Sequence, residues 1–116
     1  MKALALPVLL LALVAAKDDP LAGRAPGAPA RCIDPIRVTG PEITRAGTII
    51  YRGSAKRLWV STPIGTCPAL RPYSTLVIDR FGVDLCRGDR FRVLDPPSRI
   101  ASATCRFGPF VPWVKQ

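Results

Sequence analysis

Short runs of alternating apolar and polar residues dominate the chain, and no stretch shows sustained helical periodicity. Residues 48–52 are rich in β-branched and aromatic side chains, residues 57–61 alternate, and the turn residues Gly53-Ser54-Ala55 lie between them. Two strand-forming runs on either side of a glycine-containing turn predict a β-hairpin. Its register stays open, because the pattern does not define the length of the loop.

Residues 62–72 hold too much proline and glycine for regular structure and predict a loop that Cys67 pins to the core. Strand-forming segments resume after this loop. Residues 83–93 predict a strand, a tight turn and a second strand, and we expect the domain to be organised around this hairpin. Further short strands are predicted at 36–39, closed by Gly40-Pro41, at 75–79 and at 100–107, followed by an extended tail at 108–113 that packs on the domain. About seven short strands with frequent turns predict an all-β fold, a small sandwich or partly closed barrel stapled by disulfides.

The first residues predict a cleavable export signal. Lys2 precedes an uninterrupted apolar run that ends in small residues, and charge begins at Lys17. The run is too short to span a membrane, so we expect a signal peptide over 1–16 and a periplasmic or secreted bacterial protein; an anchor that is kept is the alternative. Residues 17–31 are alanine, proline and glycine with scattered charge, and predict a flexible leader before a single β-domain at 32–116.

Four cysteines, Cys32, Cys67, Cys86 and Cys105, in a short exported chain predict two disulfides. Zinc is a poor alternative, because the spacing contains no C-x-x-C pair and the chain has no histidine. More than one pairing is possible, and the sequence alone does not choose between them. Our hypothesis ties the proline-rich loop to the central hairpin and the first strand to the last, which gives the pairs Cys67–Cys86 and Cys32–Cys105.

The chain is strongly basic, with 17 lysines and arginines against 8 acidic residues and a net charge of +9. Cleavage of the signal would remove Lys2 and lower the net charge to +8. A basic surface suits a polyanion such as an acidic glycan or an anionic lipid headgroup. The charges do not form a block, however, so compositional bias of an alanine-, proline- and glycine-rich chain is the alternative that the pattern favours.

The strongest candidate for a polyanion patch lies near the end of the chain. Arg90, Arg92, Arg99 and Arg106 would line one face of the last two strands if those strands pair, close to Trp59 or Trp113. Arginine beside exposed aromatic rings binds acidic sugars or single-stranded nucleic acid, although an exported disulfide protein seldom meets nucleic acid. The pattern favours a solvated outer face with Phe91 and Val93 pointing inward. For both tryptophans it favours packing over a role as ligand platform.

The residues argue against the common catalytic arrangements. Without histidine, Ser-His and Cys-His nucleophiles are excluded, and the chain contains no nucleotide-binding motif or C-x-x-C redox pair. Asp84 and Asp89, on either side of Cys86, are the carboxylate pair that sugar hydrolysis would need. The arginines of the same hairpin would keep both carboxylates ionised. We therefore expect no catalytic residues, no metal and no cofactor.

The tripeptide Arg87-Gly88-Asp89 matches a motif that some animal cell-surface receptors recognise. A glycine that supplies positive φ in a tight turn and an aspartate that caps this turn explain the same residues. We favour the structural interpretation.

The contexts of the four cysteines resemble a family of small exported bacterial proteins, mostly proteobacterial, of uncharacterised function. Cys32-Ile33, Cys67-Pro68, Leu85-Cys86-Arg87-Gly88-Asp89 and Cys105-Arg106-Phe107-Gly108-Pro109-Phe110 carry the resemblance, which covers roughly residues 31–112. Phe107 departs from the leucine of other members. The resemblance implies an envelope protein with disulfides and no activity or catalytic residues to transfer.

These observations predict a non-catalytic exported β-domain that binds or supports a component of the bacterial envelope. The expected partner is an anionic glycan or lipid, or another exported protein, and not nucleic acid. The alternative function is a small inhibitor or modulator of another exported protein that presents the 62–72 loop. The sequence leaves the oligomeric state open.

Overall fold

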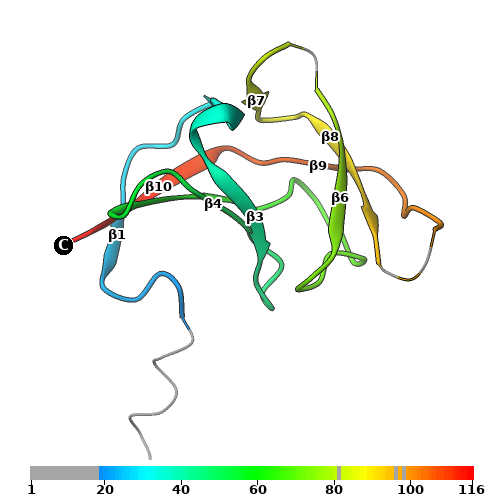
Figure 1. Cartoon of the computed structure of the whole chain (residues 1–116), viewed down its shortest axis with the longest axis horizontal. Helices are drawn as coiled ribbons and strands as arrows, with labels where there is room; N and C mark the ends of the chain where they lie inside the picture. The colour runs from blue at the N-terminus through cyan, green and yellow to red at the C-terminus, as the bar shows by residue number, and fades with distance from the viewer. Residues whose placement is uncertain (1–18, 81, 96, 98) are drawn as a thin grey trace, which may run out of the picture.

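The structure, a computed structural model, describes residues 19–80, 82–95, 97 and 99–116 and is all-β (Figure 1). The predicted signal peptide lies outside the described residues. The elements in chain order are β1 (Arg24–Pro26), β2 (Cys32–Ile33), the 3-10 turn η3 (Pro35–Arg37), β3 (Thr39–Ile43), β4 (Ile49–Arg52), β5 (Arg57–Ser61), β6 (Thr75–Asp79), β7 (Leu85–Cys86), β8 (Arg90–Leu94), β9 (Cys105–Arg106) and β10 (Phe110–Lys115).

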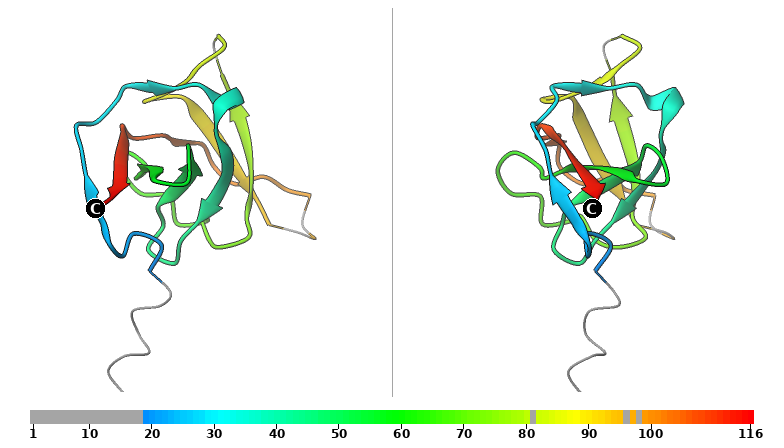
Figure 2. Two further views of the ribbon diagram at one scale, coloured as in Figure 1. Left: turned by 60° about the vertical axis from the view of Figure 1, so that its left-hand side comes forward. Right: turned by 90° about the vertical axis from the view of Figure 1, so that its left-hand side faces the viewer.

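The strands form three antiparallel sheets. The large sheet has the order β1-β10-β5-β4-β3, the small sheet has the order β6-β8-β9, and β2 pairs with β7. Figure 2 shows β2 and β7 together at one end, above the large and small sheets. No closed barrel is present among the described residues, so the arrangement is a small sandwich, as the strand pattern predicts.

The main core lies between the sheets. Alternation directs Phe91 and Val93 of β8 inward, as predicted, and they pack with side chains from every sheet. Phe107 stacks between Phe91 and Phe110, with ring centroids 4.6 and 5.8 Å apart. The buried members of this core are Ile33, Ile43, Ile49, Tyr51, Leu70, Leu85, Phe91, Val93, Cys105, Phe107 and Phe110.

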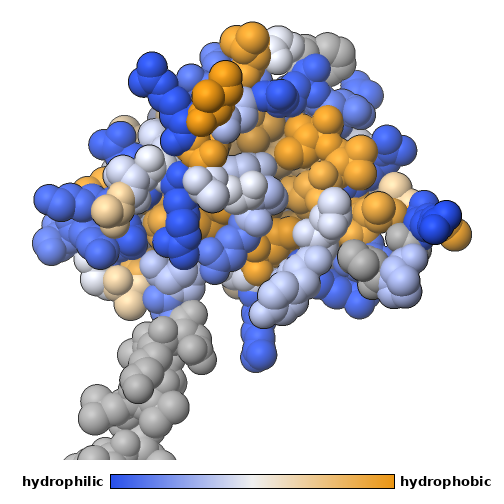
Figure 3. Space-filling view, in the orientation of Figure 1, coloured by the Kyte–Doolittle hydropathy of each residue, from blue (hydrophilic) through white to orange (hydrophobic). Residues whose placement is uncertain are grey.

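The core is less well covered between β3 and β6. Leu76 and Ile78 of β6 lie opposite Val93 and Phe91 and share their inward face, yet they are only partly buried. Figure 3 shows apolar side chains gathered between β3 and β6 on this face of the molecule. Both strands are edges of their sheets, so no strand covers the core there.

The predicted hairpin at 48–61 is confirmed, and its register pairs Ile49 with Ser61 and Arg52 with Leu58. The prediction for 36–39 is wrong at its start, because Asp34 caps the 3-10 turn η3 through an Oδ1 that accepts the Ile36 N–H at 3.0 Å. The strand instead runs through Gly40-Pro41. The predicted strand at 100–107 shrinks to β9, and the extended tail becomes β10, an interior strand of the large sheet.

The flexible leader predicted at 17–31 is also wrong where the chain joins the large sheet. Arg24–Pro26 form β1 and pair with β10, and Ala30 bridges Phe110. Leu21 packs against a second cluster on the outer face of the large sheet, made of Ile50, Leu58, Val60 and Trp113. The alternation that predicts strands is absent here, because an edge strand needs only backbone hydrogen bonds, which Ala-Pro segments partly supply.

The prediction of a central hairpin at 83–93 is wrong. The tight turn is present: Gly88 has φ of 89°, and the Asp89 N–H donates to the Cys86 carbonyl at 3.0 Å. The two flanking strands, however, belong to different sheets, since β7 pairs with β2 and β8 pairs with β6 and β9. The turn therefore passes the chain from one sheet to another.

The disulfides are Cys32–Cys86 and Cys67–Cys105, so the predicted pairing is wrong. The physical reason is the strand pairing: β2 lies beside β7, with Cys32 directly opposite Cys86. The loop with Cys67 is pinned to the core, as predicted, but through β9. With sequence separations of 54 and 38 residues, each bridge stabilises the fold by about 4 kcal/mol through the unfolded chain.

Peptide mapping without reduction tests the pairing. Trypsin places each cysteine in a separate peptide, since the Arg71-Pro72 bond resists cleavage. We expect peptide 32–37 linked to 81–87, and peptide 58–80 linked to 100–106. A link between 58–80 and 81–87 would contradict the structure and restore the pairing first expected.

Gly108 lies so close to the backbone of Thr62 that we expect any side chain at this position to destabilise the fold. A Cβ at Gly108 would collide with the Thr62 carbonyl, and the Ser61 hydroxyl already donates to the Gly108 carbonyl at 2.9 Å. We expect Gly108→Ala to lower the free energy of unfolding by about 2 kcal/mol or more, measured by urea denaturation. The control Gly23→Ala meets no atom and suffers only its φ of 77°, at a cost of about 1 kcal/mol. Equal losses would contradict the contact.

Candidate anion-binding face

The small sheet presents arginines on its outer surface. Arg90 and Arg92 are exposed, while Phe91 and Val93 between them are buried, so β8 divides cleanly into an outer and an inner face. Arg106 of β9 lies directly opposite Arg90 and is exposed. Residues directly opposite each other in an antiparallel pair point to the same face. We call the outer surface that carries Arg90, Arg92 and Arg106 the arginine face.

Asp79 places a carboxylate on the arginine face, but it makes no ion pair there. Asp79 of β6 lies opposite Arg90, and Val77 of the same strand lies opposite Arg92. Among the described residues the ion pairs are Arg37–Asp34 and Arg52–Glu42, so Asp79 forms none with Arg90. The register therefore holds Arg90 beside Arg106, an arrangement of like charges that destabilises a sheet when nothing binds to it.

The structure brings together three of the four predicted patch residues. Arg99 is exposed in the connection between β8 and β9, where no strand register places it on the arginine face. The expected neighbourhood of a tryptophan is wrong, since Trp59 and Trp113 lie on β5 and β10 of the large sheet. Both pack against buried clusters, as the packing interpretation predicted.

The turn between Cys86 and Asp89 occupies the groups considered for other roles. One Asp89 carboxylate oxygen accepts the Cys86 N–H at 2.8 Å, which confirms its role as a cap. The Gly88 N–H donates to the Phe107 carbonyl at 2.8 Å, so the tripeptide is part of the scaffold. Asp84 is exposed and immediately precedes β7. No hydrogen bond or ion pair joins it to Asp89 in the described chain.

Sequence reasoning missed that β6 is the neighbour of β8. The alternation of Thr75, Val77 and Asp79 with Leu76 and Ile78 is visible in the sequence and divides the two faces correctly. This alternation does not show which strand pairs with β6. The position of Asp79 opposite Arg90 could therefore be found only from the tertiary structure.

Tyr51 carries a buried hydroxyl that makes no hydrogen bond to any described residue, although its ring packs edge-on against Phe110 at 6.5 Å. Burial raises the pKa of Tyr51 to about 12, and the Arg80 guanidinium acts weakly in the opposite direction. No acidic or basic chemistry is assigned to this group. It is an unsatisfied polar group in the core, and its burial costs stability.

The described residues contain no group of three or more side chains arranged to hold a metal, and no helix among them is long and apolar enough to cross a membrane. All four cysteines are in disulfides. Comparison with known proteins found no matching family model, no matching curated protein and no matching solved structure. The resemblance to exported bacterial proteins therefore remains a prediction.

The raised pKa of Tyr51 predicts a loss of stability at alkaline pH. The unfolded chain releases this proton near pH 10 and the folded protein near pH 12, so the free energy of unfolding falls as pH rises between these values, by about 3 kcal/mol. We expect Tyr51→Phe to remove this loss and to be as stable as the parent near pH 8, because it deletes an unpaired buried hydroxyl. Urea denaturation at several pH values measures both effects.

Tyr73→Phe is the matched control, because Tyr73 is 96% exposed. It should keep the alkaline loss of the parent protein. If Tyr51→Phe showed the same loss as the control, another group would be responsible.

Proposed function

We propose that the chain is an exported, non-catalytic domain that binds an anionic component of the bacterial envelope through the arginine face. The observation that carries this proposal is that Arg90 lies beside Arg106 and that neither forms an ion pair with a described residue. Like charges directly opposite each other in a sheet cost stability in the free protein, and a bound polyanion would remove that cost. Arg92 extends the same face by one row of the sheet.

The shape of the arginine face suits an extended polymer. It is a sheet surface and not an enclosed pocket, so it offers rows of charge without a fixed binding depth. Arginine presents a planar set of donors that matches both carboxylate and phosphate oxygens. The shared chemistry of the ligand is therefore a chain or surface of such anions, from an acidic glycan or from anionic lipid.

The compartment supports this proposal. Two disulfides fit an oxidising environment such as the periplasm or the exterior. The predicted signal peptide and the resemblance to exported proteins point the same way. Cell-envelope glycans and lipids are the abundant polyanions of that environment.

A second candidate function is inhibition of another exported protein through the 62–72 loop. The observation that favours it is exposed apolar surface on a pinned loop: Ile64 is 48% exposed, and the Cys67–Cys105 disulfide anchors the segment to β9. The Ile64 N–H also donates to the Arg106 carbonyl at 3.0 Å, so this loop borders the arginine face. Binding of this kind would survive high salt.

The first experiment measures binding of the purified, disulfide-bonded protein to isolated envelope fractions across a salt series. We expect saturable binding that weakens steeply from low to physiological salt, because exposed charges are screened. The triple variant Arg90→Gln/Arg92→Gln/Arg106→Gln should bind about tenfold more weakly at low salt. Parallel assays on anionic lipid vesicles and on lipid-free envelope glycan distinguish the two sources.

The matched control removes three exposed cations elsewhere, Arg45, Lys56 and Lys115, each changed to glutamine. It has the same net charge as the triple variant, and its binding should stay close to that of the parent. Equal weakening of both variants would show that net charge alone matters and would overturn the proposal. Salt-resistant binding that is lost with Arg71→Glu would favour the inhibitor.

A further inference from the structure

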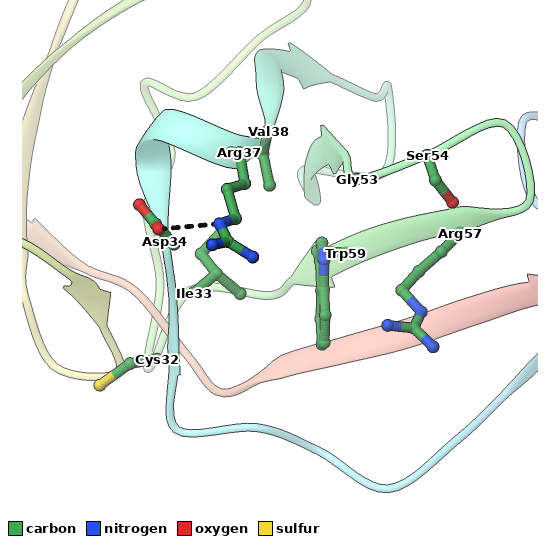
Figure 4. A pocket seen from close by; sticks show the side chains of 9 residues that line it. All are labelled: Cys32, Ile33, Asp34, Arg37, Val38, Gly53, Ser54, Arg57 and Trp59. Atoms are coloured by element: carbon green, nitrogen blue, oxygen red, sulfur yellow. Dashed lines mark ion pairs between the residues drawn. The ribbon is translucent and has the colours of Figure 1, made fainter.

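A pocket of about 330 Å³ opens between η3 and the β4–β5 hairpin, on the large-sheet side of the molecule (Figure 4). Ile33, Arg37 and Val38 line one side, and Gly53, Arg57 and Trp59 line the other. None of these residues belongs to the arginine face. We call this space the Trp59 pocket.

Trp59 gives the pocket an aromatic wall. It is the inward-facing neighbour of Tyr51, packs against the main core and is only partly buried. Its indole N–H donates no hydrogen bond to another described residue. A Cβ at Gly53 would lie 2.9 Å from the indole nitrogen. Because Gly53 has no side chain, the β4–β5 loop packs against the edge of the indole ring and fixes the position of that ring.

Two arginines stand on either side of this wall, as Figure 4 shows. The Arg57 guanidinium lies 5.5 Å from the Trp59 ring centroid and forms no ion pair with a described residue. This cation–π contact holds the guanidinium beside the ring, and no ion pair with a described residue occupies its N–H donors.

Arg37 is only loosely engaged. Its Nε lies 3.5 Å from Asp34 Oδ2, but its side chain is 85% exposed, and an ion pair that open to water contributes little. The other oxygen of Asp34 already accepts the Ile36 N–H. Arg37 can therefore turn to an incoming anion while Asp34 continues to cap η3.

We propose that the Trp59 pocket binds an acidic sugar, a pyranose unit that carries a carboxylate. The apolar C–H face of the sugar ring would lie against Trp59, Ile33 and Val38. The carboxylate of the sugar would accept hydrogen bonds from Arg57 or Arg37. The volume is at the lower end of the range for small-ligand sites, about 300 Å³ and above, which suits a short saccharide. A neutral sugar would leave the arginines unpaired, and a simple carboxylate would leave the aromatic wall uncovered.

This site goes beyond the proposed polymer binding, because its arginines, Arg37 of η3 and Arg57 of β5, lie outside the small sheet. The two proposals fail separately. Loss of the arginine face should leave the Trp59 pocket intact, and the reverse holds as well.

The test is a titration of the ¹⁵N-labelled, disulfide-bonded protein followed by NMR. The probes are cellobiouronic acid, its neutral counterpart cellobiose, and acetate. We expect cellobiouronic acid to shift the Trp59 indole N–H signal saturably, and the other two to bind at least about tenfold more weakly, because each lacks one of the two contacts. Trp113→Phe assigns the two indole signals.

Arg57→Gln should weaken binding of cellobiouronic acid by about tenfold, since a charge-assisted hydrogen bond is lost. Arg45→Gln, the same change at an exposed arginine outside both the Trp59 pocket and the arginine face, should leave the affinity unchanged. An otherwise unaltered spectrum shows that each variant is folded. No shift with cellobiouronic acid, equal affinity for cellobiose or acetate, or full affinity in Arg57→Gln/Arg37→Gln would overturn the proposal.

Discussion

The turn from Cys86 to Asp89 is the constraint on which the rest of the structure depends. Its first residue is bonded to Cys32, its Arg87 N–H donates to the Arg31 carbonyl at 2.7 Å, and its last residue accepts the Phe107 N–H at 3.0 Å. Segments from the beginning, middle and end of the chain therefore meet within four residues. This junction holds the two-stranded sheet against the small sheet and allows a short chain to enclose its aromatic core.

The distribution of charge follows from that framework. Once β8 lies between β6 and β9, the inward direction of Phe91 obliges Arg90 and Arg92 to face outward, and the register adds Arg106 to them. On the other sheet, the same alternation turns Trp59 toward η3 and Arg57 to its edge. The protein thus carries two separate groups of arginines, one on an open sheet surface and one around an aromatic wall. Together they suit a ligand that is both polyanionic and built of sugar rings.

Several features follow from local pattern alone. The all-β class, the hairpin of β4 and β5, the inward Phe91 and Val93, the turn at Gly88 and the use of all cysteines in disulfides were each predictable. The reason is that alternation, turn preference and cysteine content are properties of short segments. Arg90 and Arg92 were correctly placed on one exposed face for the same reason.

Only the tertiary structure decided which segments became neighbours. The split of β7 and β8 between two sheets, the pairs Cys32–Cys86 and Cys67–Cys105, and the pairing of β1 with β10 are all long-range. Backbone hydrogen bonds are alike for every residue type, so a strand's own sequence carries little information about its partner. The aromatic wall of Trp59 and the adjacency of Arg90 to Arg106 depend on those choices. The sequence by itself therefore determined which side chains point outward, and the three-dimensional packing decided which of them share a site.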